Sequence, residues 1–139
     1  MSESPTGYSG TPLWKKLGIL AGDTVLTMNA PAGYRKLLAG LPKGVAFITE
    51  ADPPLDFVHL FVESAADLAA RLAQLRPDLA QDGVIWVSWP KKASGVKTDV
   101  TEDVIRAAAL PLGLVDVKVC ALDAIWSGLK LVIRVANRK

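Results

Sequence analysis

The sequence predicts an α/β fold in three layers, with a mostly parallel sheet of about six strands that ends in an antiparallel hairpin strand. Apolar segments of strand length alternate with segments of helical periodicity, which is the pattern of β-α-β units. One segment, Asp56–Val62, is an almost continuous apolar run, as in a central strand covered on both faces. The helix that follows it spans ~20 Å, the length of a six-residue strand, so it can return the chain to begin a parallel neighbour.

Length and composition favour a single folded domain. The chain has 139 residues, of which 50% are hydrophobic and 22% are charged, and its formal net charge is +2. This composition is globular, and so small a charge argues neither for nor against an acidic partner. We expect a flexible arm over residues 1–10 and one domain over residues 11–139.

The sequence also carries expectations about the cellular compartment. Cys120 is the single cysteine, so no intramolecular disulfide can form, which fits a reducing compartment. No apolar run approaches the ~20 residues of a membrane span. Met1–Gly10 carries no signal-peptide pattern. We therefore expect a cytoplasmic protein with no membrane partner.

The first part of the chain predicts short helices and strands in alternation. A helix over Thr11–Gly18 has Thr11 as its cap and a glycine to end it. The β-branched and apolar segment Thr24–Met28 is a strand. A turn and a short helix lead on to the region of Ala39, and Val45–Thr49 is the second strand.

The link between the second strand and the long apolar run is short for a parallel connection. If both strands run the same way, residues 50–55 must return the chain by ~16–20 Å without a helix. Pro53 and Pro54 also interrupt strand pairing there. The direction of the second strand stays open: it is parallel with a stretched link, or else short, irregular or antiparallel.

The rest of the chain predicts longer helices and the closing hairpin. Ser64 and Asp67 match a capping box at the start of a helix that runs to Arg76. Acidic residues after Thr101 favour a second helix start because they complement the helix dipole. The short connection between the last two strands predicts an antiparallel hairpin. The expected strands are Gly83–Trp89, Val115–Leu122 and Leu129–Ala136.

The run Leu72–Ser88 places a helix, a Leu-Arg-Pro turn, a glycine and a strand in succession. In this run the chain resembles the class I S-adenosylmethionine-dependent methyltransferases, and its closing helix, strand and hairpin are similar to the end of that fold. The resemblance covers residues 22–136, and its motifs are generic. It implies a truncated, Rossmann-like domain with a methyltransferase-like strand order.

Longer and more specific stretches point to a second resemblance. They are Ser9–Leu13, Asn29–Tyr34, Val58–Val62, Trp86–Gly95 and Val117–Lys130. In these stretches the whole chain resembles DUF3052, a bacterial family of domains of unknown function. Membership of that family implies no activity.

The methyltransferase resemblance implies S-adenosylmethionine as a cofactor, held at the turn Asn29–Gly33 with Glu50 on its ribose. The turn departs from the expected pattern, because it has one glycine, Gly33, and a stiff proline, Pro31. A glycine-rich turn is what lets the backbone approach a cofactor closely. A strand end is also an ordinary place for a surface glutamate, and we favour that interpretation of Glu50.

The carboxyl edge of the predicted sheet is where we expect a site. In open α/β sheets, ligands bind at the carboxyl ends of the strands, near the point where the strand order reverses. Polar and aromatic side chains follow several of the predicted strands. The candidate ligand-binding residues are Asn29, Pro31, Gly33, Tyr34, Glu50, Glu63, Ser64, Trp89, Lys91, Lys92, Ser94 and Gly95.

The loop that follows Trp89 is the strongest candidate within this edge. It presents Lys91 and Lys92 beside the aromatic ring, with Ser94 and Gly95 next along the chain. Lysines at such a place bind phosphate or carboxylate, and an aromatic ring offers a stacking surface. The alternative is a solvated basic turn with Trp89 packed underneath. The loop does not match the P-loop pattern.

The tip of the closing hairpin is a candidate surface for a protein partner. Trp126, Ser127 and Lys130 lie at or beside it. An exposed tryptophan there would meet a partner, but a tryptophan folded back over the sheet end is the interpretation we favour.

Catalytic chemistry finds little support in the sequence. His59, the single histidine, lies mid-strand, where a buried and hydrogen-bonded histidine is commoner than a general base. Cys120 is in the same way a small core residue. One histidine and one cysteine do not supply a zinc site. Ser88 and Ser94 lack the companions of a hydrolase triad. We expect no catalytic and no metal-ligating residues.

These observations leave functions of different classes open. The leading hypothesis is a non-catalytic or regulatory domain that binds a small anionic ligand or a protein partner at the carboxyl edge of the sheet. One alternative is a divergent S-adenosylmethionine-dependent methyltransferase. The other is weak nucleic-acid binding by scattered lysines, which the small net charge argues against.

Overall fold

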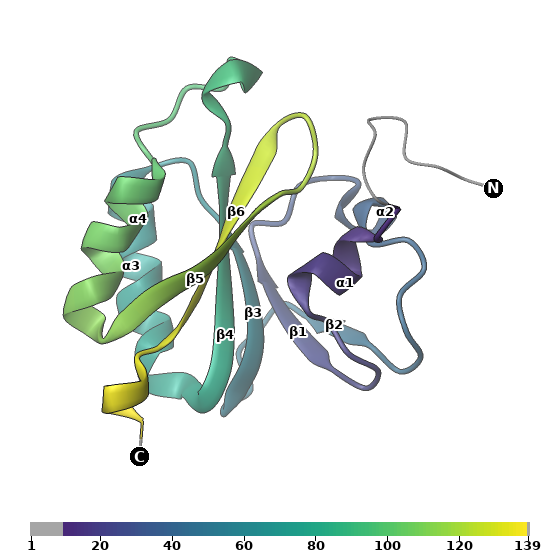
Figure 1. Ribbon diagram of the computed structural model, residues 1–139, viewed down its shortest axis with the longest axis horizontal. Helices are drawn as coiled ribbons and strands as arrows, with labels where there is room; N and C mark the ends of the chain where they lie inside the picture. The colour runs from purple at the N-terminus through teal and green to yellow at the C-terminus, as the bar shows by residue number, and fades with distance from the viewer. Residues whose placement is uncertain (1–9, 139) are drawn as a thin grey trace.

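A six-stranded mixed sheet forms the centre of the fold (Figure 1). The computed structural model describes residues 10–138, so the arm expected over residues 1–10 lies, apart from Gly10, outside the described residues. The strand order is β2-β1-β3-β4-β6-β5. The strands are β1 (Thr24–Met28), β2 (Ala46–Ile48), β3 (Leu55–Phe61), β4 (Leu79–Pro90), β5 (Leu114–Ala121) and β6 (Trp126–Ile133).

The pairing confirms a mostly parallel sheet with an antiparallel closing strand. β1 pairs in parallel with β2 and β3, and β3 pairs in parallel with β4. β6 runs antiparallel to both β4 and β5 and lies between them, so β5 is an edge strand. The β5–β6 register shifts between Asp116 and Lys118, and Val117 and Val119 on this edge are exposed.

Helices cover both faces of the sheet and complete the three layers (Figure 1). α3 (Ala65–Leu75) and α4 (Glu102–Ala109) lie on one face, and the short α1 (Leu13–Leu17) and α2 (Tyr34–Leu37) lie on the other. Ser64 caps α3 as predicted, and Thr101 caps α4 where the acidic residues predicted a helix start. Each accepts a hydrogen bond from the backbone amide three residues on. In α1 the N-cap position is occupied by Pro12 and not by Thr11. No helix within residues 10–138 is long and apolar enough to cross a membrane.

The core is divided by the sheet into two apolar clusters. Side chains of β3 and β4 that face α3 and α4, such as Val58 and Ile85, build one cluster. Phe61 and Trp86 belong to the other, which lies under α1 and α2. Because successive side chains of a strand point to opposite faces, the nearly continuous apolar run of β3 fills both clusters.

The direction of β2, which the sequence left open, is parallel. β2 has only three residues, and its last, Ile48, is level with Leu26 of β1, which in turn pairs with Val58 of β3. The chain therefore drops back by only about three residues, roughly 10 Å, to begin β3 at Leu55. A link of a few residues spans that distance without a helix.

β4 and β6 begin several residues earlier than the sequence predicts. β4 starts at Leu79, which pairs with Leu55 before the register shifts. At Gly83 an added Cβ would lie 2.6 Å from the Leu55 carbonyl oxygen, so a close approach of the backbones requires glycine. β6 starts at Trp126, so the hairpin loop is shorter than expected and Trp126 belongs to a strand.

Candidate functional site

The strand order reverses at β1, which places the expected site. The chain passes from β1 to β2 on one side and then crosses to β3 on the other. The carboxyl ends of β1 to β5 and the start of β6 share one edge, where Pro90 is paired with Trp126. Cavities open along this edge, and the charge of their linings differs.

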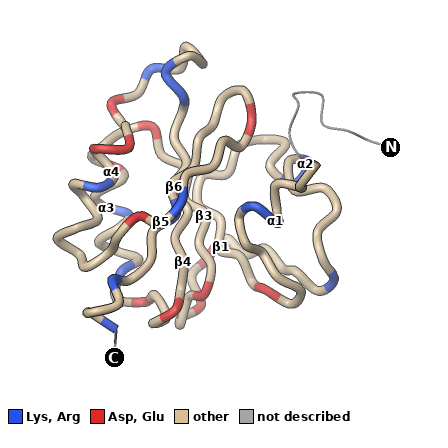
Figure 2. The backbone as a smooth tube through the Cα atoms, in the orientation of Figure 1, with Lys and Arg blue, Asp and Glu red and all other residues tan. Residues whose placement is uncertain are grey.

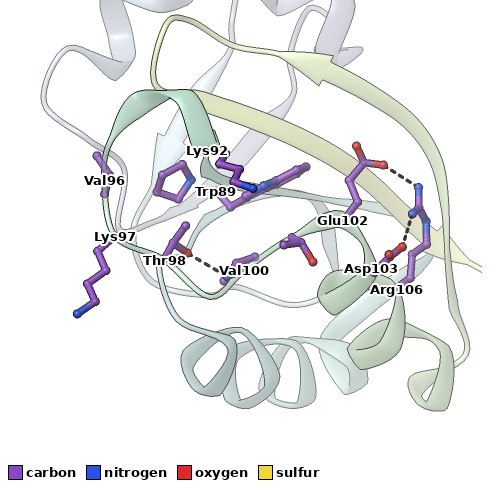
Figure 3. A pocket seen from close by; sticks show the side chains of 11 residues that line it. Trp89, Lys92, Val96, Lys97, Thr98, Val100, Glu102, Asp103 and Arg106 are labelled. Atoms are coloured by element: carbon purple, nitrogen blue, oxygen red, sulfur yellow. Dashed lines mark hydrogen bonds and ion pairs between the residues drawn. The ribbon is translucent and has the colours of Figure 1, made fainter.

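The loop cavity, of about 660 Å³, lies between the segment that follows β4 and the start of α4 (Figure 3). Trp89 forms part of its floor and is only 7% exposed, so the tryptophan packs under the loop and does not offer a free stacking face. The residues that line this cavity are Trp89, Pro90, Lys92, Val96, Lys97, Thr98, Val100, Thr101, Glu102, Asp103 and Arg106.

Hydrogen bonds fix the backbone of the loop over residues 91–100. The Lys91 amide donates to the carbonyl of Ile125 at 2.7 Å. The Thr98 hydroxyl donates to the carbonyl of Glu63 at 2.6 Å, and the Asp99 carboxylate accepts from the first amide of α3 at 2.7 Å. The loop is therefore tied to the hairpin and to the start of α3, and its shape is set before any ligand arrives.

Two lysines that line the loop cavity have side chains without a partner. Lys92 and Lys97 are exposed, and their ammonium groups make no hydrogen bond or ion pair with any residue in the described range 10–138. In Figure 3, Lys92 leans over Trp89, whereas Lys97 points outward from the rim. Figure 2 shows the cationic segments of this loop at the top of the molecule, above the acidic start of α4.

The opposite wall of the loop cavity is an ion-pair cluster. Arg106 contacts Glu102 at 2.8 Å, Asp103 at 3.1 Å and Asp116 at 3.0 Å. The hydrogen bond to Asp116, followed by the one to Glu102, raises the pKa of Arg106. The guanidinium is thus saturated by its own neighbours, and its single positive charge is shared among three carboxylates.

The switch-point cavity, of about 580 Å³, lies between the ends of β1 and β3. Its lining holds two carboxylates and one lysine, Lys97, which borders the loop cavity as well. Trp126 is 9% exposed and meets the ring of Phe61 edge-on at 5.0 Å, so it is folded back over the sheet end. The lining residues are Asn29, Pro31, Phe61, Glu63, Ser64, Asp67, Lys97 and Trp126.

The α2 cavity, also of about 580 Å³, lies between α2 and the ends of β1 and β2. Arg35 and Lys36 are the charged residues of its lining. The complete lining is Thr27, Ala30, Pro31, Gly33, Tyr34, Arg35, Lys36, Phe47 and Thr49.

A buried polar chain runs through the sheet below this edge. The Tyr34 hydroxyl lies 2.8 Å from Nδ1 of His59, and the Ser88 hydroxyl lies 2.8 Å from Nε2. His59 and Ser88 are both 0% exposed. Burial lowers the pKa of His59 to about 3 and raises the pKa of Tyr34. The expectation of a buried, hydrogen-bonded histidine is confirmed.

The candidate residues of the sequence divide among these features. Asn29, Pro31, Glu63 and Ser64 meet at the switch-point cavity, and Pro31, Gly33 and Tyr34 at the α2 cavity. Trp89 and Lys92 line the loop cavity, whereas Lys91, Ser94 and Gly95 shape the loop without lining it. Glu50, Ser127 and Lys130 line none of these three cavities.

Several cavity residues were missed by the sequence reasoning. Lys97 and Thr98 belong to the same polar loop as Lys92, and a wider reading of that loop finds them. Arg106 faces the cavity one helical turn into α4, and Arg35 and Phe47 come from separate elements. Arg35 directly follows the candidate Tyr34 in the sequence, whereas no spacing links Arg106 or Phe47 to the candidates.

The residues present do not fit S-adenosylmethionine in the way that the resemblance implies. Glu50, the expected ribose ligand, is exposed and lies outside the cavity linings described above. Asn29 takes a positive φ of 61°, and Pro31 stiffens the turn that should approach a cofactor. The carboxylates that line the switch-point cavity are instead Glu63 and Asp67.

Metal binding and nucleophilic chemistry were not expected from the sequence. Among residues 10–138, no three His, Cys, Asp or Glu side chains gather as a metal site would require. Cys120 is 8% exposed, and burial raises the pKa of its thiol. Its interpretation as a small core residue is confirmed.

Comparison with solved structures shows the fold. A candidate type 11 methyltransferase from Sulfolobus solfataricus matches with a TM-score of 0.61 at 13% identity, over 99% of this chain and 96% of that one. An S-adenosylmethionine-dependent methyltransferase from Aquifex aeolicus matches with a TM-score of 0.60 at 14% identity, over 87% of each chain. The ribosomal protein L11 methylase of Lactobacillus delbrueckii subsp. bulgaricus gives 0.55 at 15% identity, over 88% and 76%. At these identities the likeness establishes a Rossmann-like, methyltransferase-like architecture.

Comparison of sequences gives the family. No curated protein matches the chain. The sequence pattern of DUF3052, described as a protein of unknown function, matches residues 47–135, which is more than half of the chain and includes β3, the loop cavity and the hairpin. The chain therefore belongs to the DUF3052 family.

Proposed function

We propose that this protein is a non-catalytic domain that binds a small anionic ligand in the loop cavity, at the carboxyl edge of the sheet. The observation that carries the proposal is the loop itself. Its backbone is held by hydrogen bonds, while the ammonium groups of Lys92 and Lys97 have no partner among residues 10–138. A preformed loop with available cations beside an apolar floor is the usual composition of a small-molecule site.

The lining indicates the kind of ligand. Trp89 and Val100 are buried beneath the cavity, and Val96 is an exposed apolar side chain of its lining. Carboxylate or phosphate groups bind lysine ammonium groups through charge-assisted hydrogen bonds. On the far wall, Glu102 and Asp103 are already paired with Arg106. The lining holds three cations (Lys92, Lys97 and Arg106) and two carboxylates, so its formal net charge is +1, and the two lysines are the cations without a partner.

The positions of His59 and Cys120 support a function in binding and not in catalysis. His59, the single histidine, has both ring nitrogens bonded inside the sheet and does not line the loop cavity. Cys120 is buried and also lies outside that lining. We place the protein in the cytoplasm, because a chain with a single cysteine suits reducing conditions.

Titration of the isotope-labelled protein with inorganic pyrophosphate and with citrate, followed by NMR, tests the proposal. We expect backbone shifts concentrated in residues 92–100. The double variant Lys92→Gln, Lys97→Gln should weaken binding by at least about tenfold, since each lysine loses a charged hydrogen bond. Lys43→Gln removes an exposed lysine outside the cavity and is the matched control. No shifts in the loop at ~10 mM of either anion, or equal weakening by the control, refutes the proposal.

The same titration with S-adenosylhomocysteine tests the methyltransferase alternative. Shifts centred on residues 29–33 and Glu50 would favour that alternative and displace the proposal of a non-catalytic domain. Binding weaker than about −3 to −4 kcal/mol, with no shifts at a few millimolar, would leave the alternative without support.

A further inference from the structure

The α2 cavity is lined by cations and by no carboxylate. Arg35 and Lys36 both come from α2 and are both exposed. Neither makes an ion pair with a described residue. The switch-point cavity, by contrast, is lined by two carboxylates and one lysine. The lining of the α2 cavity therefore has a formal charge of +2 with no carboxylate to offset it.

Arg35 is held in place by an aromatic ring. Its guanidinium carbon lies 4.2 Å from the centroid of Phe47, a residue of β2. This cation–π contact orients the guanidinium plane without using its hydrogen-bond donors. The donors remain available to an oxyanion, which arginine binds through two parallel hydrogen bonds.

The aromatic wall of the cavity is anchored in the core. Phe47 meets the ring of Tyr34 edge-on, with 5.9 Å between the centroids. Tyr34 is 4% exposed, and its hydroxyl is bonded to His59 inside the sheet. The hydrogen bond to His59 fixes the ring of Tyr34. Tyr34 in turn orders Phe47, and Phe47 orders Arg35 at the surface.

The rest of the lining is suited to a flat apolar body. Pro31, Ala30 and Phe47 contribute apolar surface, and the hydroxyl groups of Thr27 and Thr49 stand at the strand ends. A volume of about 580 Å³ lies within the range of small-molecule sites. One end of the cavity is therefore cationic and its wall is aromatic.

We propose that the α2 cavity is a second ligand site, which takes a small aromatic oxyanion: a planar ring that bears a carboxylate or a phosphate. Arg35 and Lys36 bind the oxyanion, and the ring packs against Pro31 and Phe47. Recognition depends on the negative charge and on the flat ring together, since each matches a different part of the lining.

Phenyl phosphate and benzoate are the probes, with benzylamine as the oppositely charged control and benzyl alcohol as the neutral one. In NMR titrations of the full chain we expect phenyl phosphate or benzoate to shift the amides of Thr27, Gly33 and Thr49 and the side-chain signal of Arg35. The probe that binds more tightly shows whether the site prefers a phosphate or a carboxylate. Equal binding of benzylamine, or no shifts with either anion at ~10 mM, overturns the proposal.

Variants test whether binding depends on Arg35 and Lys36 or on general surface charge. Arg35→Gln and Lys36→Gln should each weaken binding by at least about tenfold. Arg35→Lys keeps the charge but loses the paired donors, so it should weaken binding to an intermediate extent. Lys43→Gln, outside the cavity, should leave binding unchanged. If Lys43→Gln weakens binding as much as Lys36→Gln does, the probes bind to surface charge alone and the proposed site is wrong.

This site is independent of the loop cavity. The α2 cavity shares no lining residue with the loop cavity. The double variant Lys92→Gln, Lys97→Gln should therefore leave the binding of phenyl phosphate intact. Loss of binding in that variant would assign the probe to the loop cavity and refute the second site, whatever the titrations with pyrophosphate show.

Discussion

His59 makes the stability of the protein depend on pH. Burial lowers its pKa from 6.5 to about 3, so between these values the unfolded chain binds a proton that the folded chain does not. The free energy of unfolding must then fall as the pH drops through this window. The chain has a single histidine, so between pH 7 and pH 5 we expect a loss of about 2 kcal/mol from this residue. Urea denaturation at pH 7, 6 and 5 measures it.

The variant His59→Gln supplies the control for this prediction. It should be less stable than the wild type at pH 7, because the hydrogen bonds to Tyr34 and Ser88 are disturbed. Its stability should nevertheless change little between pH 7 and pH 5. A loss in the variant as large as in the wild type would show that another group governs the pH dependence.

The sequence predicts the character of His59 but not its partners. A mid-strand position among apolar residues is enough to indicate burial, and burial requires satisfied nitrogens. Tyr34 and Ser88 are 25 and 29 residues away along the chain. Only the assembled sheet brings α2 and β4 to the same imidazole ring, so Ser88 appeared to have no companion.

Thr98 links the loop over residues 91–100 to the segment between β3 and α3, and it helps to keep the loop backbone ordered. Its hydroxyl donates to the carbonyl of Glu63 and accepts from the amide of Val100 at 3.0 Å. Thr98→Val removes both bonds at nearly constant volume. We expect amide hydrogen exchange over residues 95–100 to accelerate at least about fivefold, since the free energy of local opening falls by about 1 kcal/mol or more. The control is Thr49→Val, at an exposed threonine directly after β2, which should leave exchange in the loop unaltered. Unaltered loop exchange in Thr98→Val would contradict the role given to Thr98.

Elements whose signals are local were predicted well from the sequence. The caps Ser64 and Thr101 depend on neighbours three residues away, and both helices begin as expected. The direction of β2 and the early start of β6 at Trp126 depend instead on pairing with β1 and β4. Such pairing is decided by tertiary contacts, which no local pattern reports.

For the molecule as a whole, the two faces of the sheet should differ in local stability. α3 and α4 cover one face with 11 and 8 residues, whereas α1 and α2 have 5 and 4. We expect the amides of β3, β4 and β6 to exchange slowest and those of α1, α2 and β2 fastest, because short peripheral elements open without unfolding the sheet. Native-state hydrogen exchange measures this order. Exchange in α1 as slow as in β4 would contradict it.

The sequence predicted the edge of the sheet at which the cavities lie, but not how that edge is divided among them. Parallel strands and a reversal of strand order place a site at their carboxyl ends, and all three cavities described above lie there. The separation into cavities of different charge follows from side chains such as Lys97, Arg35 and Asp67, which the chain supplies from distant segments. The positions of these side chains around the cavities depend on the folded geometry, and the spacing of residues in the sequence does not predict them.

The edge strand β5 has a consequence for behaviour at high concentration. A flat edge with free backbone groups is a template on which another molecule can add its own strand, and sheets then polymerise. Here the register shift between Asp116 and Lys118 bends the edge, and a charged lysine stands beside exposed Val117 and Val119. A bulge and a charge are means by which natural sheets prevent such growth. The irregularity in β5 thus disfavours edge-to-edge pairing between molecules, although this edge strand exposes apolar side chains.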